Sequence, residues 1–121
     1  DSATLLTGEA GESIAPGEPI YRKTADRKYY KAQADTSEKA DAKGIAINYA
    51  DSGDTVVAVA KGEMDSGATL VQGVQYAVSP TSGKIKPVDE LVTNDYVTPL
   101  AVAKTTALFD VLPNATGYQV G

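Results

Sequence analysis

The chain is a succession of short extended runs separated by turn residues, and no segment of its 121 residues supports a long helix. The runs are rich in Val, Ile, Thr and Tyr, which suit a pleated and partly buried backbone. The one segment compatible with a helix is residues 34–43, where Thr36 or Ser37 could cap a single turn. The pattern therefore predicts an all-β domain with at most one helical turn.

Strand-forming segments recur along the whole chain from residue 12 onward. We expect extended structure at residues 12–14, 19–23, 28–32, 45–49, 55–60, 68–71, 74–78, 84–88, 96–103 and 105–112. The runs at residues 44–47 and 56–60 are continuously apolar but built from small side chains. Such strands are buried on both faces or lie where sheet walls approach closely. This composition favours a compact small β-barrel or β-clip-like domain over an open sheet.

A weak internal repeat suggests two similar halves. The spacing Gly11, Ile14, Gly17, Ile20 recurs 56 residues later as Gly67, Leu70, Gly73, Tyr76. The same shift places residues 45–47 on 101–103, and nearly the same shift places residues 30–31 on 85–86. We therefore predict two similar β halves packed into one domain spanning residues 11–121.

The first ten residues are small and polar around one apolar pair, Leu5 and Leu6. Terminal segments are ordered only where something holds them in place, and two adjacent leucines offer apolar surface for docking. We interpret residues 1–10 as an extended N-terminal arm, with a short edge strand of the same sheet as the alternative.

The side-chain inventory excludes most catalytic chemistry. The chain has no cysteine and no histidine, so disulfides, thiolate nucleophiles, imidazole bases and the usual zinc ligands are absent. Nearly all carboxylates stand beside turn residues, where they cap turns. We predict no enzyme activity, no cofactor and no metal. A weak calcium site between acidic loops and a hydrolase with paired carboxylates remain the alternatives.

Charge and hydropathy point away from nucleic acid and membranes. The formal net charge of -5 should repel a phosphate backbone. No stretch reaches the roughly 18 to 20 apolar residues that span a bilayer, and the first residues do not resemble a signal peptide. We expect a soluble chain that contacts neither.

Tyrosine dominates the aromatic residues, with seven Tyr, one Phe and no Trp. Its apolar ring and polar tip suit half-buried strand positions and contact surfaces alike. Tyr29, Tyr30 and Tyr49 are the candidate contact aromatics, and ordinary packing is the competing interpretation.

Residues 11–21 (Gly-Glu-Ser-Ile-Ala-Pro-Gly-Glu-Pro-Ile-Tyr), 43–47, 53–62, 73–79 and 100–103, taken in order, resemble the small decoration, or cement, proteins of tailed-bacteriophage heads. The likeness covers most of residues 10–112. It implies a compact β domain that binds the outer surface of the mature capsid, often as a homotrimer, and stabilises contacts between subunits of the major capsid protein. The arm of residues 1–10 would carry the anchors Leu5 and Leu6, and the virion would be the location. A phage tail or fibre domain that recognises a host surface is the alternative.

Overall fold

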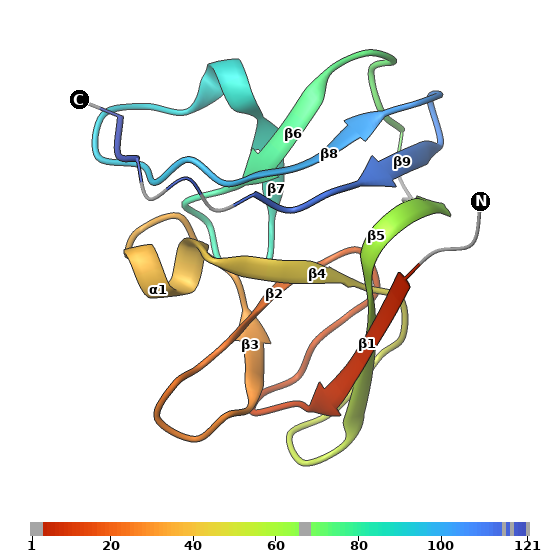
Figure 1. The fold of residues 1–121 in the computed structure, drawn as a ribbon, viewed down its shortest axis with the longest axis vertical. Coiled ribbons are helices and arrows are strands. Elements are labelled where there is room, and N and C mark those ends of the chain that lie inside the picture. The colour runs from red at the N-terminus through yellow and green to blue at the C-terminus, as the bar shows by residue number, and fades with distance from the viewer. Residues whose placement is uncertain (1–3, 66–68, 115, 117, 121) are drawn as a thin grey trace.

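A computed structural model describes residues 4–65, 69–114, 116 and 118–120, and this part of the chain is nearly all-β (Figure 1). The prediction of an all-β domain is confirmed. In chain order the elements are β1 (Thr4–Glu9), β2 (Pro19–Arg22), β3 (Tyr29–Lys31), α1 (Ser37–Ala40), β4 (Ala42–Ala46), β5 (Thr55–Asp65), β6 (Gln75–Val78), β7 (Ile85–Pro87), the 3₁₀ turn η1 (Val88–Glu90), β8 (Pro99–Ala103) and β9 (Leu108–Val111).

The strands form one curled antiparallel sheet in the order β3-β2-β4-β5-β9-β8-β6-β7, and β1 pairs with β5 outside this path. Read outward from the centre, the strands β5-β4-β2-β3 on one side match their counterparts β9-β8-β6-β7 on the other. Figure 1 shows the two resulting halves, with β1 to β4 below and β6 to β9 above. An isolated parallel bridge between Ala10 and Tyr29 brings the end of β1 beside β3, so the lower half curls back on itself.

The two halves repeat each other in strand register. Pairing of Ile20 with Lys31 in the β2–β3 hairpin corresponds to pairing of Tyr76 with Pro87 in the β6–β7 hairpin, a shift of 56 residues. A register shift interrupts the β2–β4 pair after Ile20, and another interrupts the β6–β8 pair after Tyr76. The predicted duplication is therefore present in the fold.

The turns before the hairpins repeat as well. Gly17 and Gly73 both have positive φ, at 89° and 84°, and each donates its N–H at 2.8 Å to the carbonyl oxygen of the last residue of a strand, Ala46 of β4 or Ala103 of β8. Tyr30 pairs with Tyr21 and Lys86 pairs with Ala77, so Lys86 is the counterpart of Tyr30, one residue from the position that the sequence spacing gave. Gly67 lies outside the described residues.

Burial on both faces explains the apolar small-residue runs. Ile20, Ala46 and Ala58 belong to a cluster inside the first half. Their neighbours Tyr21, Ile45 and Val59 belong to a second cluster with residues of the other half, including Val78, Leu100 and Val111. Adjacent residues of one strand thus pack on opposite faces, as predicted. A Cβ on Gly44 would lie 2.6 Å from the carbonyl oxygen of Val59, so the absence of a side chain at this position lets β4 approach β5.

Several strand boundaries differ from the prediction. The strand expected at residues 45–49 is β4 at Ala42–Ala46, because its pairing with β2 decides its register. β5 continues for eleven residues, past Gly62 to Asp65, because its second part becomes the first strand of the second half. Residues 12–14 and 69–71 are not strands. The helical turn is confirmed as α1, where Thr36 Oγ1 accepts the Lys39 N–H at 3.2 Å.

The extended N-terminal arm is not observed over residues 4–9. These residues form β1, which pairs with β5 from Thr4 opposite Lys61 to Glu9 opposite Thr55. The pairing supplies hydrogen-bond partners for the backbone, and Leu6 packs against the cluster inside the first half. The alternative of an edge strand is therefore the correct one for this segment, and residues 1–3 lie outside the described part of the chain.

Candidate functional site

A hollow of about 410 Å³ lies where β5 passes from the first half to the second. Along β5, pairing with β1 ends at Lys61 and pairing with β9 begins at Gly62. Neither neighbouring strand therefore fully covers β5 at this point. A register shift between Thr4 and Leu5 marks the same place on β1. The lining residues are Thr4, Lys61, Gly62, Glu63, Lys104, Asp110, Val111 and Leu112.

An exposed ion pair forms one wall of the hollow. Lys104 Nζ lies 2.6 Å from Glu63 Oε2, and this hydrogen bond lowers the pKa of the Glu63 carboxyl and raises the pKa of the Lys104 ammonium. Glu63 also lies opposite Asp110 in the β5–β9 pair, so Lys104 offsets the repulsion of two neighbouring carboxylates. Because solvent screens this exposed pair, it contributes little to stability, and its main effect is to fix where the two charges lie.

Two exposed apolar side chains accompany these charges. Leu5 follows Thr4 on β1 and is 54% exposed, and Leu112 follows β9 and is 62% exposed. Leu5 and Leu6 have different roles, because Leu6 points to the core while Leu5 remains on the surface. Sequence reasoning identified Leu5 but missed Leu112, Glu63 and Lys104, which no motif links. Exposed leucines with a charged rim can form a contact surface.

The candidate tyrosines do not share one stacking face. Tyr29 and Tyr30 are consecutive on β3, so their rings leave opposite sides of the strand. A Cβ on Gly8 would lie 2.3 Å from the Tyr29 ring, and a Cβ on Gly11 would lie 2.2 Å from the Tyr30 ring. These two tyrosines therefore pack over glycines. Tyr49 is 61% exposed, and its hydroxyl donates to Asp51 Oδ1 at 2.9 Å.

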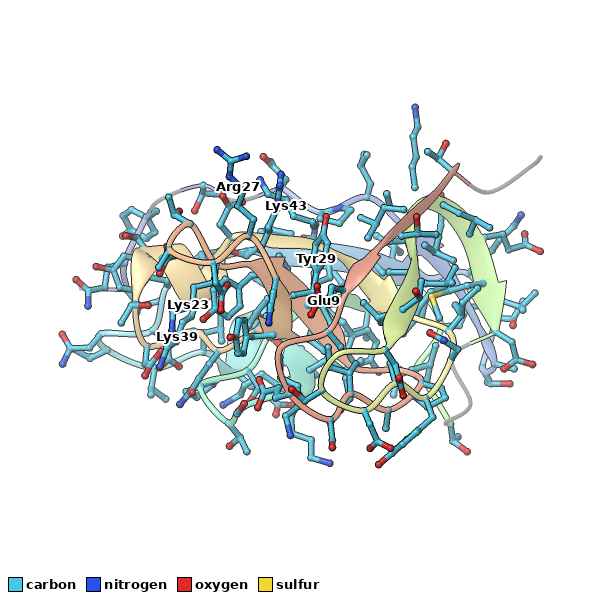
Figure 2. All side chains as sticks on the ribbon, turned by 90° about the horizontal axis from the view of Figure 1, so that it is seen from below. Glu9, Lys23, Arg27, Tyr29, Lys39 and Lys43 are labelled. Carbon is cyan, nitrogen blue, oxygen red and sulfur yellow. The ribbon has the colours of Figure 1, made fainter. Side chains whose placement is uncertain are left out.

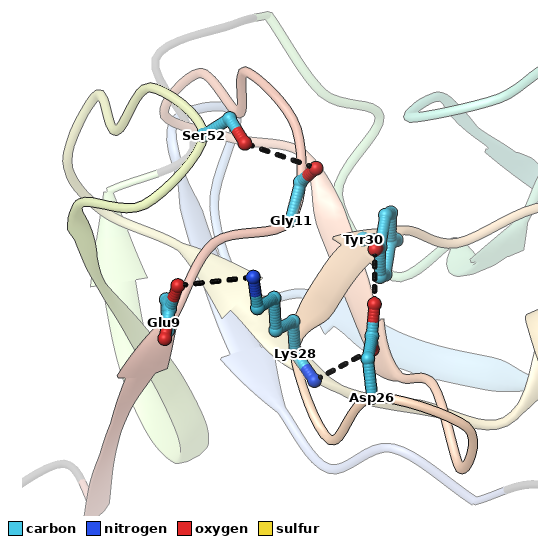
Figure 3. Close-up of polar contacts among 6 residues, drawn as sticks. All are labelled: Glu9, Gly11, Asp26, Lys28, Tyr30 and Ser52. Atoms are coloured by element: carbon cyan, nitrogen blue, oxygen red, sulfur yellow. Dashed lines mark hydrogen bonds and ion pairs between the residues drawn. The ribbon is translucent and has the colours of Figure 1, made fainter.

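A polar network joins the end of β1 to the β2–β3 hairpin (Figure 3). Lys28 Nζ lies 3.2 Å from Glu9 Oε2, and the Lys28 N–H donates to Asp26 Oδ1 at 3.0 Å. The Tyr30 hydroxyl donates to the other oxygen of Asp26. This hydrogen bond raises the pKa of Tyr30 to about 12 and lowers the pKa of Asp26. At neutral pH Tyr30 is therefore protonated and Asp26 ionised, which is the state in which this hydrogen bond forms.

Four further carboxylates accept backbone N–H groups, and two of them, Glu18 and Asp95, cap turns as the sequence predicted. Glu12, Glu18, Glu38 and Asp95 each accept a backbone N–H, at 2.9, 2.7, 3.2 and 2.9 Å. Residues 51–54 form a turn closed by the Asp54 N–H and the Asp51 carbonyl at 2.9 Å. Glu18 and Asp95 therefore act in local turns, whereas Glu12 and Glu38 connect segments that are distant in sequence.

The described residues contain no cluster of three metal-ligating side chains and no buried side-chain nitrogen or oxygen without a hydrogen-bond partner. Within the same residues, no helix is long and apolar enough to cross a membrane. No protein-family model and no curated protein sequence matches this chain at a significant level.

Proposed function

We propose that this chain is a decoration protein of a tailed-bacteriophage head, which binds the outer surface of the capsid and braces neighbouring major capsid subunits. The family resemblance over residues 10–112 and the all-β fold support the proposal. The observation that carries it is Leu5, an exposed leucine on an edge strand beside the hollow at the junction of the two halves.

Strand β1 suits docking because, among the described residues, it pairs only with β5. The other edge of such a strand presents backbone N–H and C=O groups that a strand of a partner can pair with. Leu5 and Leu112 supply apolar anchors, and the ion pair of Lys104 with Glu63 supplies a polar rim. A few buried anchors provide most of the energy of such contacts, while the rim determines the register.

A homotrimer would strengthen such binding. Each additional docked subunit holds the others close to the surface, so modest contacts add to a high overall affinity. The proposed partner is the major capsid protein, and the proposed location is the outer surface of the virion.

Cosedimentation with expanded phage heads that lack this chain tests the proposal, using heads assembled from the capsid protein of the same genome. Leu5→Asp should lower binding about tenfold or more, because it places a charge at an apolar anchor. Val92→Asp is the matched control, since Val92 is 60% exposed but lies after η1, away from the hollow.

The two variants separate two failures. Absence of binding by the unaltered protein would refute the decoration function. Equal binding by a folded Leu5→Asp variant would refute docking through β1 and leave the function standing.

The tail or fibre alternative rests on Tyr49, whose exposed ring could stack on a sugar. A glycan array with the unaltered protein and Tyr49→Ala tests it. Binding that disappears in the variant would favour host recognition over decoration.

A further inference from the structure

A basic region stands out in an otherwise acidic chain. Residues 22–43 contain seven of the eleven Lys and Arg residues but only four of the sixteen Asp and Glu residues. This segment is therefore net positive, while the rest of the chain carries four basic against twelve acidic residues. The segment comprises the end of β2, the β2–β3 hairpin, α1 and the first residues of β4.

The structure gathers part of this charge around one groove. The groove measures about 420 Å³ and is lined by Arg22, Lys23, Thr24, Arg27, Asp41 and Lys43. Figure 2 shows Arg27 and Lys43 side by side and extending away from the body of the domain. The basic groove, as we call this set of six residues, lies between the β2–β3 hairpin and the start of β4.

Most of its cations have no acidic partner. Asp41 lies 3.1 Å from Lys43 Nζ, which accounts for the one carboxylate of the lining. Arg22 Nε donates only to the Arg27 carbonyl at 3.4 Å, and Lys23 Nζ lies 5.2 Å from the centre of the Tyr30 ring. Among the described residues, no carboxylate lies within ion-pair distance of Arg22, Lys23 or Arg27.

Two more carboxylates stand nearby, and both are engaged. Glu38 accepts the Thr24 N–H, and Asp26 accepts from the Lys28 N–H and the Tyr30 hydroxyl. The four cations of the lining outnumber Asp41 and these two carboxylates together, so the groove keeps an excess of positive charge.

The second half of the fold provides an internal comparison. By the shared hairpin register, the counterparts of Arg22, Lys23 and Arg27 are Val78, Ser79 and Gly83. Arg27 and Gly83 both have left-handed backbones, with φ of 61° and 73°. Glycine adopts this conformation without strain, whereas arginine does not. The hairpin of the second half thus forms with an uncharged glycine at this position. The turn of the first half therefore does not require the arginine side chain.

We propose that the basic groove binds an acidic segment of a protein partner, and that the guanidinium groups of Arg22 and Arg27 form hydrogen bonds with its carboxylates. The planar arginine fork matches a carboxylate with two parallel hydrogen bonds. A protein segment fits better than a nucleic acid, because the acidic remainder of the chain repels an extended phosphate backbone beyond the groove. This assignment does not depend on the partner being a capsid.

Fluorescence polarisation tests the proposal with two labelled probes, a short peptide of alternating Asp and Gly and an oligothymidylate of equal length. The double variant Arg22→Gln/Arg27→Gly removes two charges from the groove and, at residue 27, installs the residue of the second half. The matched control Lys84→Gln/Lys86→Gln removes two charges from the equivalent β6–β7 hairpin.

The peptide should bind the unaltered protein and the control alike and should bind the groove variant at least about tenfold more weakly, with all three proteins equally folded by circular dichroism. Three results would overturn the proposal: no peptide binding by the unaltered protein, equal loss in both variants, or tighter binding of the oligothymidylate that the groove variant abolishes. Light scattering at low salt checks for self-association. A larger mass of the unaltered protein and of the control, but not of the groove variant, would also overturn the proposal and identify a second copy of this chain as the occupant.

Discussion

The repeated hairpin permits an exchange of residues whose two effects should have opposite signs. Arg27 and Gly83 occupy the same position of the two hairpins, and both have positive φ. We expect Arg27→Gly to stabilise the protein and Gly83→Ala to destabilise it. The comparison tests whether the duplication extends to backbone conformation.

The structure sets the expected magnitudes. Removing a side chain from the left-handed region relieves about 1–2 kcal/mol. Glycine also gives the unfolded chain greater freedom, which offsets about 0.4–1 kcal/mol of the relieved strain. Arg27→Gly should therefore raise the free energy of unfolding by about 1 kcal/mol, which corresponds to roughly 4 °C in melting temperature.

Gly83→Ala acquires the same strain and adds a collision. A Cβ on Gly83 would lie 2.6 Å from Glu18 Oε2, and the other oxygen of this carboxylate accepts the Ala15 N–H at 2.7 Å. Displacing the Glu18 carboxylate costs about 0.5–1.5 kcal/mol of hydrogen bonding. With the gain from a stiffer unfolded chain subtracted, Gly83→Ala should lower the free energy of unfolding by about 2 kcal/mol.

Urea unfolding followed by tyrosine fluorescence and circular dichroism measures both changes. Equal slopes of free energy against urea would show that the unfolded states are comparable. A destabilised Arg27→Gly protein, or a Gly83→Ala protein as stable as the original, would refute the backbone equivalence.

Three further predictions concern the core, the hairpin network and the assembly. Phe109 is 1% exposed and meets Tyr76 edge-on at 5.7 Å, so Phe109→Ala should cost about 3–5 kcal/mol in urea unfolding; a cost near that of Val102→Ala, on the exposed face of β8, would contradict the assigned core. Spectrophotometric titration should show one tyrosine that ionises near pH 12, and this transition should disappear in Tyr30→Phe. Because the pKa of Tyr30 in the folded protein is raised from 10.0, the Tyr30–Asp26 hydrogen bond contributes its full stability below pH 10. This contribution is lost as the pH rises through about 12. Light scattering at increasing concentration should reveal a trimer, and a monomer at every concentration would restrict the proposed trimer to assembly on the capsid.

Much of the fold could be predicted from local signals. The glycines at positions 17 and 73 and the apolar spacing around them indicated two similar halves, because each turn needs a residue that tolerates positive φ. The small residues Gly44 and Ala46 indicated strands buried on both faces, and the structure confirms this burial. The single turn capped by Thr36 was also predicted, because capping depends on neighbouring residues alone.

The candidate surfaces were less accessible to sequence reasoning. Leu5 was identified because it is apolar in a polar segment, but its exposure and the burial of Leu6 depend on which face of β1 meets β5. Lys104 and Glu63 are far apart in sequence, and only the pairing of β5 with β9 and β8 with β9 brings them together. Tyr29 and Tyr30 looked like contact residues, yet the glycines beneath them show that packing occupies both rings.

The amino-acid sequence alone dictated an all-β chain with two matching halves and no cysteine or histidine chemistry, since these properties follow from composition and short-range spacing. Tertiary structure decided that β5 serves both halves, that residues 4–9 are a strand rather than an arm, and that unpaired cations gather in one groove of the first half. The physical reason is that turns and extended backbone arise from neighbouring residues, whereas register and facing surfaces arise from pairings between distant strands, where a slip of one residue exchanges the buried and exposed faces.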